Sequence, residues 1–469
     1  MKDKDLLLNK IRKGDQLSRR ERLSLIIALS IPAMLAELAG ICQSYIDASM
    51  VGRIGAEASA SIGLMSSSIW LFNGLTMAAM TGFTVQTAQR IGASQEEHAR
   101  NILKQAFAIG MTLAFVMGGV GLAISGRLPI WLGGNENITA DATAYFATLM
   151  AALPMMMIRN LAGGFLRASG NVKTPSFVYM LVCASDVVFN FFLIFPTRVI
   201  GGITVPGAGL GVFGAALGTM LSDVVGSAIL MIALFVRPNV LKPVKGEKLH
   251  FVADDLKSWV RITLPVLGER VATNGAQIIC TRIVAPLGTI SIAAHSYGVT
   301  AESLCYCPGF GISEAAGMLV GQSIGAKRKD LAYDLGRMNT ILGMGVMTLT
   351  GILMYIFAPN IMGILSVDPG VIELGARVLR IEAFAEPLFA ASIVCAGVLR
   401  GAGDTLMSGV ISLCSMWLVR VPLSAILAGS MGLNGVWLAM ALELSIRGIM
   451  FLIRLKRKKW LNASDKDLG

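Results

Sequence analysis

Twelve long apolar runs constrain the fold of this chain more than any other feature of its sequence. A membrane-spanning helix needs about 20 apolar residues, and every run reaches that length. The longer runs fit tilted helices or helices that extend into water. The runs cover residues 23–52, 58–88, 101–125, 138–165, 174–196, 209–236, 258–286, 291–320, 332–358, 372–399, 405–429 and 432–453. They predict an all-α polytopic membrane protein with twelve transmembrane helices.

The composition supports the membrane class. Hydrophobic residues make up 54% of the 469 residues and charged residues only 15%, whereas soluble domains carry about 25% charged residues. The mean hydropathy is +0.68. All seven Cys lie within apolar runs, where they are expected to pack as small core residues.

The distribution of positive charge predicts the orientation in the membrane. Most of the 40 Lys and Arg residues lie in the termini, in the 237–257 segment and in turns on the same side, while only Arg53, Arg127 and Arg198 lie in the opposite loops. Positive residues concentrate on the cytoplasmic side, so both termini are predicted to be cytoplasmic in a multi-pass plasma-membrane protein. The first 22 residues are polar and do not read as a cleavable signal peptide. The net charge of +11 then reflects topology, and no nucleic-acid partner is expected.

The two halves of the chain repeat each other at an offset of 233 residues. This offset pairs Pro32 with Pro265, and the Gln-Arg-Ile-Gly-Ala run at 89–93 with the Gln-Ser-Ile-Gly-Ala run at 322–326. Each half holds six runs, an even number, so both halves enter the membrane in the same sense, as in transporters built from parallel repeats. Such lobes are expected to enclose a central cavity that opens to each side in turn.

The repeat also predicts the domain organisation. The predicted parts are a cytoplasmic N-terminal segment 1–22, an N-lobe 23–236 with helices 1–6, a cytoplasmic linker 237–257, a C-lobe 258–453 with helices 7–12, and a cytoplasmic tail 454–469. The first half is roughly 12 residues longer than the second, and the excess is expected in the 196–210 loop.

Three runs of the N-lobe each carry two polar residues four positions apart, which places them on one helix face. The pairs are Gln43/Asp47, Asp186/Asn190 and Thr219/Asp223. From the helical rise, they lie at similar depth, about 8–12 Å from the outer helix ends. Carboxylate, amide and hydroxyl oxygens suit a hard cation such as Na⁺, and a buried carboxylate also accepts a proton.

Hydrogen bonding between helices is the structural alternative for these polar residues, and it is favoured for Gln43 and Thr219 taken alone. Asp47 and Asp186 instead favour a functional site, because a carboxylate inside the membrane is costly to bury. No Lys or Arg of the N-lobe spans is expected to neutralise either carboxylate.

Short motifs along both halves resemble the multidrug and toxic compound extrusion (MATE) transporters. The first half carries, in family order, Pro32, Ile46-Asp47, Val51-Gly-Arg-Ile-Gly55, Gln89-Arg-Ile-Gly-Ala93, Leu166-Arg-Ala-Ser-Gly170 and Gly211-Val-Phe-Gly-Ala-Ala-Leu-Gly-Thr219. The resemblance covers roughly residues 25–455, both halves in order. Each motif is short and rich in Gly, and the ordered set is the specific signal.

The resemblance implies a coupling-ion site. One branch of the family has an Asp on the first helix, an Asn/Asp pair four residues apart on the fifth helix and a Thr on the sixth. Asp47, Asp186, Asn190 and Thr219 fall on these positions, although the fifth-helix pair stands here in Asp-then-Asn order. The resemblance therefore implies that these four residues bind Na⁺ or H⁺.

Further acids are candidates for additional sites. In the N-lobe, Gln43, Asp223 and Glu37 could form an additional ion or proton site. Other branches of the family place a working Glu on the seventh helix; Glu269 is the corresponding candidate, although it follows Pro265 by only one turn. The remaining charges of the C-lobe are expected to pair between helices; they are Arg270, Glu302, Glu314, Glu382, Glu386, Arg420, Glu443 and Arg447.

The sequence contains one match to an enzyme motif, and its context does not support that reading. The Gly209–Gly214 run satisfies G-x-G-x-x-G, but no βαβ unit surrounds it, so we predict a tight turn that packs helix ends. There is no P-loop motif, and the three His residues are far apart in the sequence. The chain is therefore predicted not to be an enzyme and to need no cofactor apart from the coupling ion.

These observations predict a secondary active antiporter that exports organic cations or other small amphipathic compounds across a lipid bilayer in exchange for Na⁺ or H⁺. A monomer is expected. The alternative is a flippase for lipid-linked saccharides built from similar halves. A basic central cavity would favour the flippase, whereas this chain offers few Arg residues for such a cavity and many acids.

Overall fold

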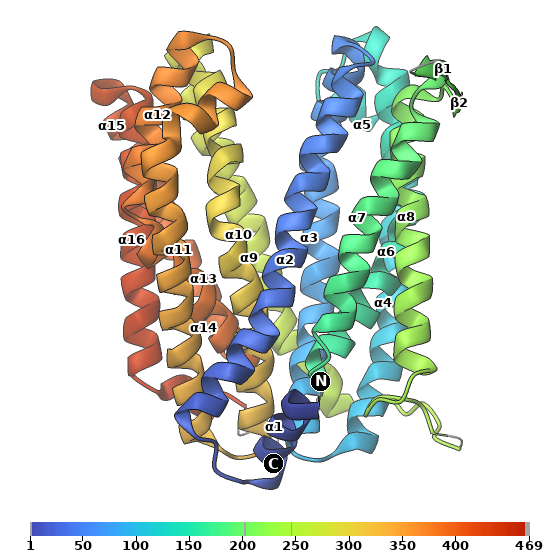
Figure 1. Cartoon of the computed structure of the whole chain (residues 1–469), viewed down its shortest axis with the longest axis vertical. Coiled ribbons are helices and arrows are strands. Elements are labelled where there is room, and N and C mark those ends of the chain that lie inside the picture. Colours follow the sequence, from blue (N-terminus) through green and yellow to red (C-terminus); the bar gives the residue numbers. More distant parts are fainter. Residues whose placement is uncertain (1, 201–202, 245, 465–469) are drawn as a thin grey trace. The chain divides into compact units, whose positions relative to one another are not determined.

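The computed structural model describes residues 2–200, 203–244 and 246–464, and helices dominate it (Figure 1). Packing divides the chain into two compact units. Unit 1 consists of Met1–Leu38, Ala88–Gln95 and Ala253–Gly469, and unit 2 consists of Ala39–Thr87 and Glu96–Val252. This division follows contacts and therefore cuts through two helices, whereas the predicted lobes are bounded by loops.

Within the described residues, twelve long helical elements correspond to the twelve predicted spans. They are α2 (Arg19–Gly52), α3 (Ala56–Gly92), α4 (Glu96–Ile124), α6 (Glu136–Ala168), α7 (Lys173–Leu193), α8 (Gly211–Phe235), α9 (Ala253–Val284), α10 (Thr289–Gly325), α11 (Lys329–Leu365), the pair α12 (Pro369–Ala383) and α13 (Glu386–Gly401), the run α14 (Thr405–Ser415), η2 (Met416–Arg420) and α15 (Val421–Met431), and α16 (Leu433–Lys456). Shorter helices flank them, namely α1 (Lys2–Lys13), α5 (Leu128–Trp131), η1 (Ala285–Leu287) and η3 (Lys459–Asn462).

The predicted all-α membrane fold is confirmed. In the described part of the chain, nine helices are long and apolar enough to cross a membrane, or ten with α12 and α13 taken as one. The predicted span 372–399 is a pair of helices bent by 60°. Pro387 accounts for the break, because its ring clashes with the carbonyl of the residue four positions earlier, Ala383, where α12 ends.

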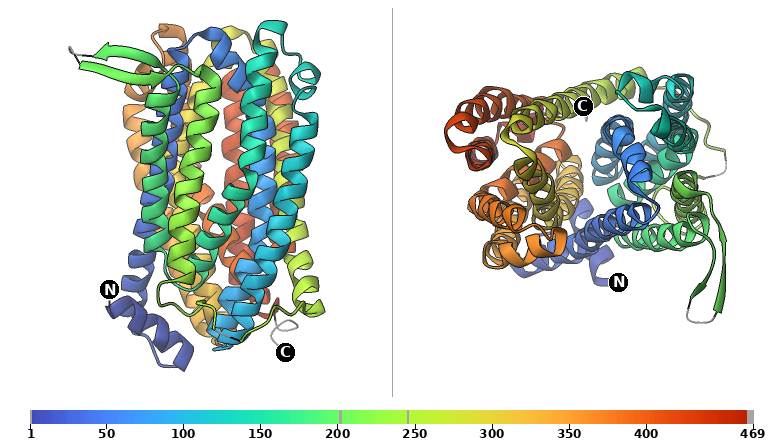
Figure 2. Two further views of the ribbon diagram at one scale, coloured as in Figure 1. Left: turned by 90° about the vertical axis from the view of Figure 1, so that its right-hand side faces the viewer. Right: turned by 90° about the horizontal axis from the view of Figure 1, so that it is seen from above.

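The extra length of the first half contains two strands that the sequence analysis did not predict. β1 (Pro196–Ile200) and β2 (Ile203–Ala208) pair antiparallel, with Arg198 opposite Val205. Figure 2 shows the strands running outward from the ends of α7 and α8. Their β-branched residues are typical of strands.

The turn between β2 and α8 confirms the interpretation of the glycine-rich run as a packing device. Gly209 and Gly211 adopt positive φ values of 65° and 55°, which only glycine adopts without strain. The amide of Gly209 donates to the carbonyl of Phe195, and that of Gly211 donates to the carbonyl of Ile194. The turn thus satisfies carbonyls that follow the end of α7.

Glycines on α8 let its backbone approach α7 closely. A Cβ at Gly214 would lie 2.6 Å from the carbonyl oxygen of Leu193, and one at Gly226 would lie 2.4 Å from a methyl group of Val182. Small residues at four-residue spacing are the common means by which membrane helices pack. The face of α8 that carries the predicted site is therefore held firmly against α7.

In unit 1, the matched motifs of the two repeats pack against each other. A Cβ at Gly92 of α3 would lie 2.0 Å from the carbonyl oxygen of Gln322, and a Cβ at Gly325 of α10 would lie 1.8 Å from that of Gln89. These four residues form two pairs at the offset of 233, so the contact is reciprocal, as expected at a two-fold axis. The ends of α3 and α10 are thus in backbone contact.

The C-terminal segment covers this contact. The side chain of Gln89 donates to the carbonyl of Gly401 at 3.0 Å and to the hydroxyl of Ser464 at 2.9 Å. Trp460 is fully buried and donates to the carbonyl of Leu455. The described tail therefore packs on the ends of α3 and α13.

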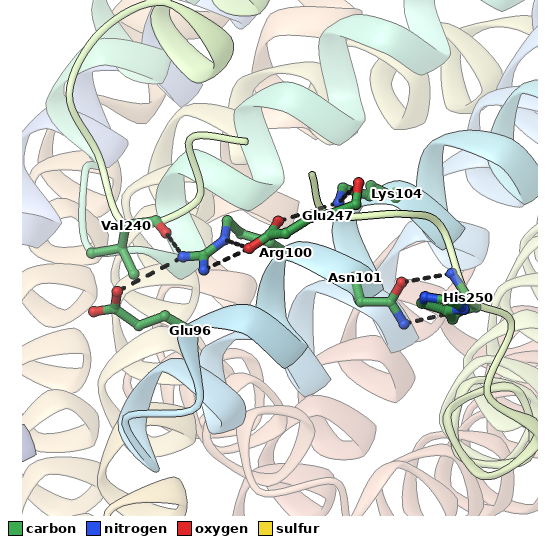
Figure 3. A network of polar contacts seen from close by, with 7 residues as sticks. All are labelled: Glu96, Arg100, Asn101, Lys104, Val240, Glu247 and His250. Atoms are coloured by element: carbon green, nitrogen blue, oxygen red, sulfur yellow. Dashed lines mark hydrogen bonds and ion pairs between the residues drawn. The ribbon is translucent and has the colours of Figure 1, made fainter. Parts of the chain in front are cut away.

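A polar network holds part of the predicted linker against α4 in unit 2 (Figure 3). Glu247 pairs with Arg100 at 2.8 Å and with Lys104 at 3.2 Å. Asn101 exchanges two hydrogen bonds with the backbone of His250. The hydrogen bond from Arg100, supported by Lys104, holds the pKa of Glu247 below its ordinary value.

Candidate functional site

The side chain of Asn190 joins the two acids of the predicted site in unit 2. Its Nδ2 donates to Oδ1 of Asp47 at 2.9 Å and to Oδ2 of Asp186 at 3.1 Å. Asp47 comes from α2, while Asp186 and Asn190 lie on successive turns of α7. Asp186 and Asn190 are buried and Asp47 is half-buried. One amide group therefore bridges two carboxylates from two helices.

Two oxygen atoms in this group have no hydrogen-bond donor. Oδ1 of Asp186 and Oδ1 of Asn190 are both buried and have no partner among the described residues. A buried acceptor left without a partner costs about 1–3 kcal/mol. A cation would satisfy both oxygens, and a proton would satisfy the carboxylate, so the donor set fits the predicted ligands.

Gly218 on α8 provides the space for the Asn190 amide. A Cβ at Gly218 would lie 2.1 Å from Oδ1 of Asn190 and 3.0 Å from its Cγ. Any other residue would therefore displace the amide that bridges the two carboxylates. Gly218 is a site residue that the sequence analysis missed, although it directly precedes Thr219.

Thr219, the fourth residue of the predicted coupling-ion set, and Gln43, which was assigned to a possible additional site, both lie beside Asp186. Gln43 of α2 and Thr219 of α8 are both close enough to interact with its carboxylate. The Thr219 hydroxyl also donates to the carbonyl of Ala215 on its own helix at 3.2 Å. Three helices thus contribute a carboxylate, an amide or a hydroxyl to one group of side chains, as the sequence analysis predicts.

An apolar cluster covers the site on its loop side. It consists of Val51, Ala58, Ile194, Val212 and Ala215, with Tyr145 of α6 packed against it. Val51 and Ile194 follow Asp47 and Asn190 by one helical turn, and Ala215 precedes Thr219 by one turn. Apolar side chains next to the site lower the local dielectric, which strengthens electrostatic interactions within it.

Asp223 does not join this group but forms a salt bridge with an arginine. Its Oδ1 lies 2.9 Å from Nη1 of Arg159 on α6, and both side chains are mostly buried. No Lys or Arg was expected to neutralise Asp186; Arg159 pairs with Asp223, yet it is close enough to act on Asp186 electrostatically. Arg159 is the single basic residue inside the predicted span 138–165, and an isolated basic residue in an apolar run is a sequence signal for a buried, paired charge.

Glu37 and Glu269 belong to unit 1. Neither is among the side chains grouped around Asn190 in the described structure. Glu37, on the unit 1 part of α2, interacts with Cys307 of α10. Glu269 of α9 interacts with Arg400 of α13. Their proposed roles in ion binding therefore stay predictions.

The buried acids of unit 1 are only partly paired. Glu443 lies 3.1 Å from Nε of Arg447 and 4.0 Å from Nη1 of Arg420, as expected for charges that pair between helices or along one. Glu382 and Glu386 are fully buried, and none of their four carboxylate oxygens has a hydrogen-bond partner in the described structure. The pairing hypothesis therefore fits Glu443 but not these two acids.

No cluster typical of a tightly held metal is present in the described part of the chain, since no three His, Cys, Asp or Glu side chains are grouped to hold one. A cation at Asp47 and Asp186 would rely on amide and hydroxyl oxygens in addition to the two carboxylates.

Comparison with protein families identifies one match. The model of the MatE family matches residues 32–192 and 265–426, one segment in each half. A probable multidrug resistance protein NorM from Thermotoga maritima is 25% identical over 442 residues, which cover 93% of this chain and 92% of that protein. A protein of the same name from Streptococcus pneumoniae is 26% identical over 444 residues, covering 93% of this chain and 95% of that protein.

Solved structures show the same fold. A crystal structure of MATE in complex with MaL6 has a TM-score of 0.86 at 19% identity and covers 96% of this chain and 98% of that chain. A MOP superfamily transporter from Pyrococcus furiosus, whose description refers to a binding pocket of reverse polarity and a different function, has a TM-score of 0.88 at 19% identity, covering 97% of this chain and 98% of that chain.

Proposed function

The chain belongs to the MatE family, and from this we propose that it is a secondary active multidrug antiporter, which exports amphipathic compounds, organic cations among them, in exchange for Na⁺ or H⁺. The family model matches both halves of the chain. Relatives that span nearly its whole length are described as probable multidrug resistance proteins. Both termini are proposed to be cytoplasmic, in the plasma membrane, and the working unit is proposed to be a monomer.

The arrangement of Asp47, Asp186 and Asn190 is the single observation that carries the proposal of ion coupling. Two carboxylates share one amide, and two buried oxygens lack donors. Adjacent carboxylates repel each other, so a cation or a proton between them is strongly favoured. A site that gains so much from one positive charge is suited to couple ion entry to a conformational change.

Coupling requires that the ion and the drug favour different states, because a ligand shifts an equilibrium only by its differential affinity. Ion binding would draw α2, α7 and α8 together around the bridging amide. Pro32 in α2 removes one backbone hydrogen bond and weakens the helix there, which would help α2 to bend during this step.

A flippase for lipid-linked saccharides is the second candidate. Its anionic substrates need a basic binding surface. The buried carboxylates Glu302, Glu382, Glu386 and Glu443 outnumber the Arg residues beside them, Arg420 and Arg447. This excess of acidic over basic side chains supports the export of cationic compounds over the transport of saccharide phosphates.

Reconstituted proteoliposomes test the proposal. An inward Na⁺ gradient and an inward H⁺ gradient are imposed one at a time, and efflux of a fluorescent organic cation is followed. We expect one of the gradients to accelerate efflux and Asp47→Asn to abolish that acceleration at equal reconstitution. If neither gradient changes the efflux rate, or if Asp47→Asn retains the acceleration by a gradient, the proposed antiport is excluded.

A further inference from the structure

Arg159 lies beside the candidate ion site without belonging to the motifs that define it. Its guanidinium pairs with Asp223 at 2.9 Å and lies over the ring of Tyr179, 5.5 Å from the centroid. Its Nε is buried and has no hydrogen-bond partner in the described structure. It also interacts electrostatically with Asp186. Arg159 thus pairs directly with the carboxylate of Asp223 and also acts electrostatically on the carboxylate of Asp186 in the ion site.

The structure around Arg159 holds this charge in place. Gly226 on α8 leaves room for the side chain, since a Cβ there would lie 3.3 Å from Cδ of Arg159. The hydroxyl of Tyr179 packs against Gly40 of α2, where a Cβ would lie 2.9 Å away. Independently of the ion pair, Ser227 on α8 donates to the carbonyl of Met155 on α6 at 2.7 Å. The helices would therefore stay packed if the charges were removed.

We propose that Arg159 and Asp223 form a fixed charge pair that sets the cation affinity of the site at Asp47, Asp186 and Asn190. Arg159 opposes a bound cation by direct repulsion, and Asp223 screens that repulsion. The inference rests on the proposed coupling-ion site and adds to it a pair of residues that tunes how tightly the ion binds. Arg159 is a positioning charge and does not contact the ion.

Removing the charge of Arg159 and removing the charge of Asp223 should change Na⁺ affinity in opposite directions. A purely structural role of the pair would change it in the same direction. Asp223 lies one helical turn, about 5.4 Å, beyond Thr219. A unit charge at one to two turns, in the effective dielectric of a partly buried site, changes cation affinity by about tenfold. Arg159→Gln should therefore bind Na⁺ about tenfold more tightly, and Asp223→Asn about tenfold more weakly. The double variant should return close to the wild-type affinity.

Isothermal titration of Na⁺ into detergent-purified protein, in the absence of drug, tests this. Arg159→Lys keeps the charge and should stay within about threefold of wild type. Arg237→Gln removes a positive charge just beyond the far end of α8, about 20 Å along the helix, and should change nothing. A wild type without measurable Na⁺ binding that gains it in Arg159→Gln would also support the inference.

Equal weakening of binding in Arg159→Gln and Asp223→Asn would overturn the inference, because it indicates that the pair only holds α6 and α8 together. Unchanged affinity in both variants, or no Na⁺ binding in any variant, would overturn it as well. Binding is measured without transport, so the two proposals can fail separately. If the variants show these affinities but the protein exports nothing, the inference stands and the proposed function is wrong.

Discussion

The amide of Asn190 is the residue-scale feature on which the candidate site depends. It donates both of its N–H groups to carboxylates. Its own carbonyl oxygen and one oxygen of Asp186 are left without a hydrogen-bond donor in the described structure. Hydrogen bonds to charged groups contribute about 1.5–3 kcal/mol each, so this orientation is well determined. The amide therefore both holds two helices together and leaves open the oxygens that a cation needs.

Asp186→Ala and Asn190→Ala should both weaken cation binding, and Asp186→Ala more strongly because it removes a charge. We expect a loss of at least about tenfold for Asp186→Ala, the size of one unit charge at close range in a partly buried site. Isothermal titration of Na⁺ and of protons measures the effect. If Asn190→Ala proved the only damaging change, the argument from charge would be wrong.

Gly218→Ala should damage the same site without touching a charged residue. Its Cβ would displace the Asn190 amide, and the loss of one charge-assisted hydrogen bond corresponds to about tenfold or more in affinity. Gly119→Ala on α4 is the matched control, since nothing lies within 4 Å of the added Cβ. Cation affinity that falls equally in both variants, or in neither, would contradict the assigned role of Gly218.

Spacing predicts which polar residues share a helix face, whereas the grouping of Asp47, Asp186, Asn190 and Thr219 from three helices was implied by the resemblance to the MATE family. Spacing does not predict how α6 is rotated against α8. The pairing of Arg159 with Asp223 depends on that rotation and on a small residue at Gly226, so it could be found only in the structure.

At the scale of elements, apolar runs predict helices well because a bilayer demands helices of a minimum length. They do not resolve a break within a run. The bend between α12 and α13 depends on the local clash at Pro387, and η2 is a five-residue π-helical segment that ends at the buried Arg420. Such segments occur often at functional sites, and nothing in the hydropathy of the run marks this one.

The linker near Glu247 should detach from α4 when the pH falls. The pKa of Glu247 is lowered by its hydrogen bond from Arg100, below the ordinary 4.5. A lowered pKa in the folded state means that the contact stabilises above the ordinary pKa and is lost as pH falls through the folded value. Hydrogen exchange of residues 239–250, corrected for intrinsic rates, should show protection at pH 7 that decreases below about pH 4.5.

Glu247→Gln should remove this pH dependence and raise exchange at pH 7 by about fivefold, the size expected of one partly exposed ion pair. Glu373→Gln, which breaks an exposed pair with Arg377 on α12, is the control and should leave residues 239–250 unchanged. Protection that survives in Glu247→Gln would assign the anchoring to Asn101 instead.

At the scale of the whole molecule, the internal repeat has a direct structural consequence. The offset of 233 residues predicts that matched positions are related by an axis along the membrane normal. Gly92 and Gly325 are such a pair. Gly92 lies against Gln322, and Gly325 lies against Gln89. The repeat predicts the relation between these residues, while the backbone contact itself depends on how closely α3 and α10 approach.

Gly325→Ala should destabilise this contact, because its Cβ would lie 1.8 Å from a backbone oxygen that cannot rotate away. Overpacking of this kind costs about 1–3 kcal/mol, which should lower the thermal midpoint of the purified protein. Gly345→Ala on α11, with nothing within 4 Å, should leave the midpoint unchanged or raise it. Equal midpoints for the two variants would show that α3 and α10 are not held in this contact.

Exchange of an ion for a drug is the central claim, and linkage tests it most directly. If ion and drug favour different states, the ion must lower drug affinity and the drug must lower ion affinity by the same factor. Equilibrium binding of a fluorescent organic cation is measured with and without saturating Na⁺ and across pH, for wild type and for Asp47→Asn. The proposed antiport predicts that Na⁺ or protons weaken drug binding by about 5–150-fold in the wild type and have little effect in Asp47→Asn. Drug affinity in the wild type that is indifferent to both ions would contradict it.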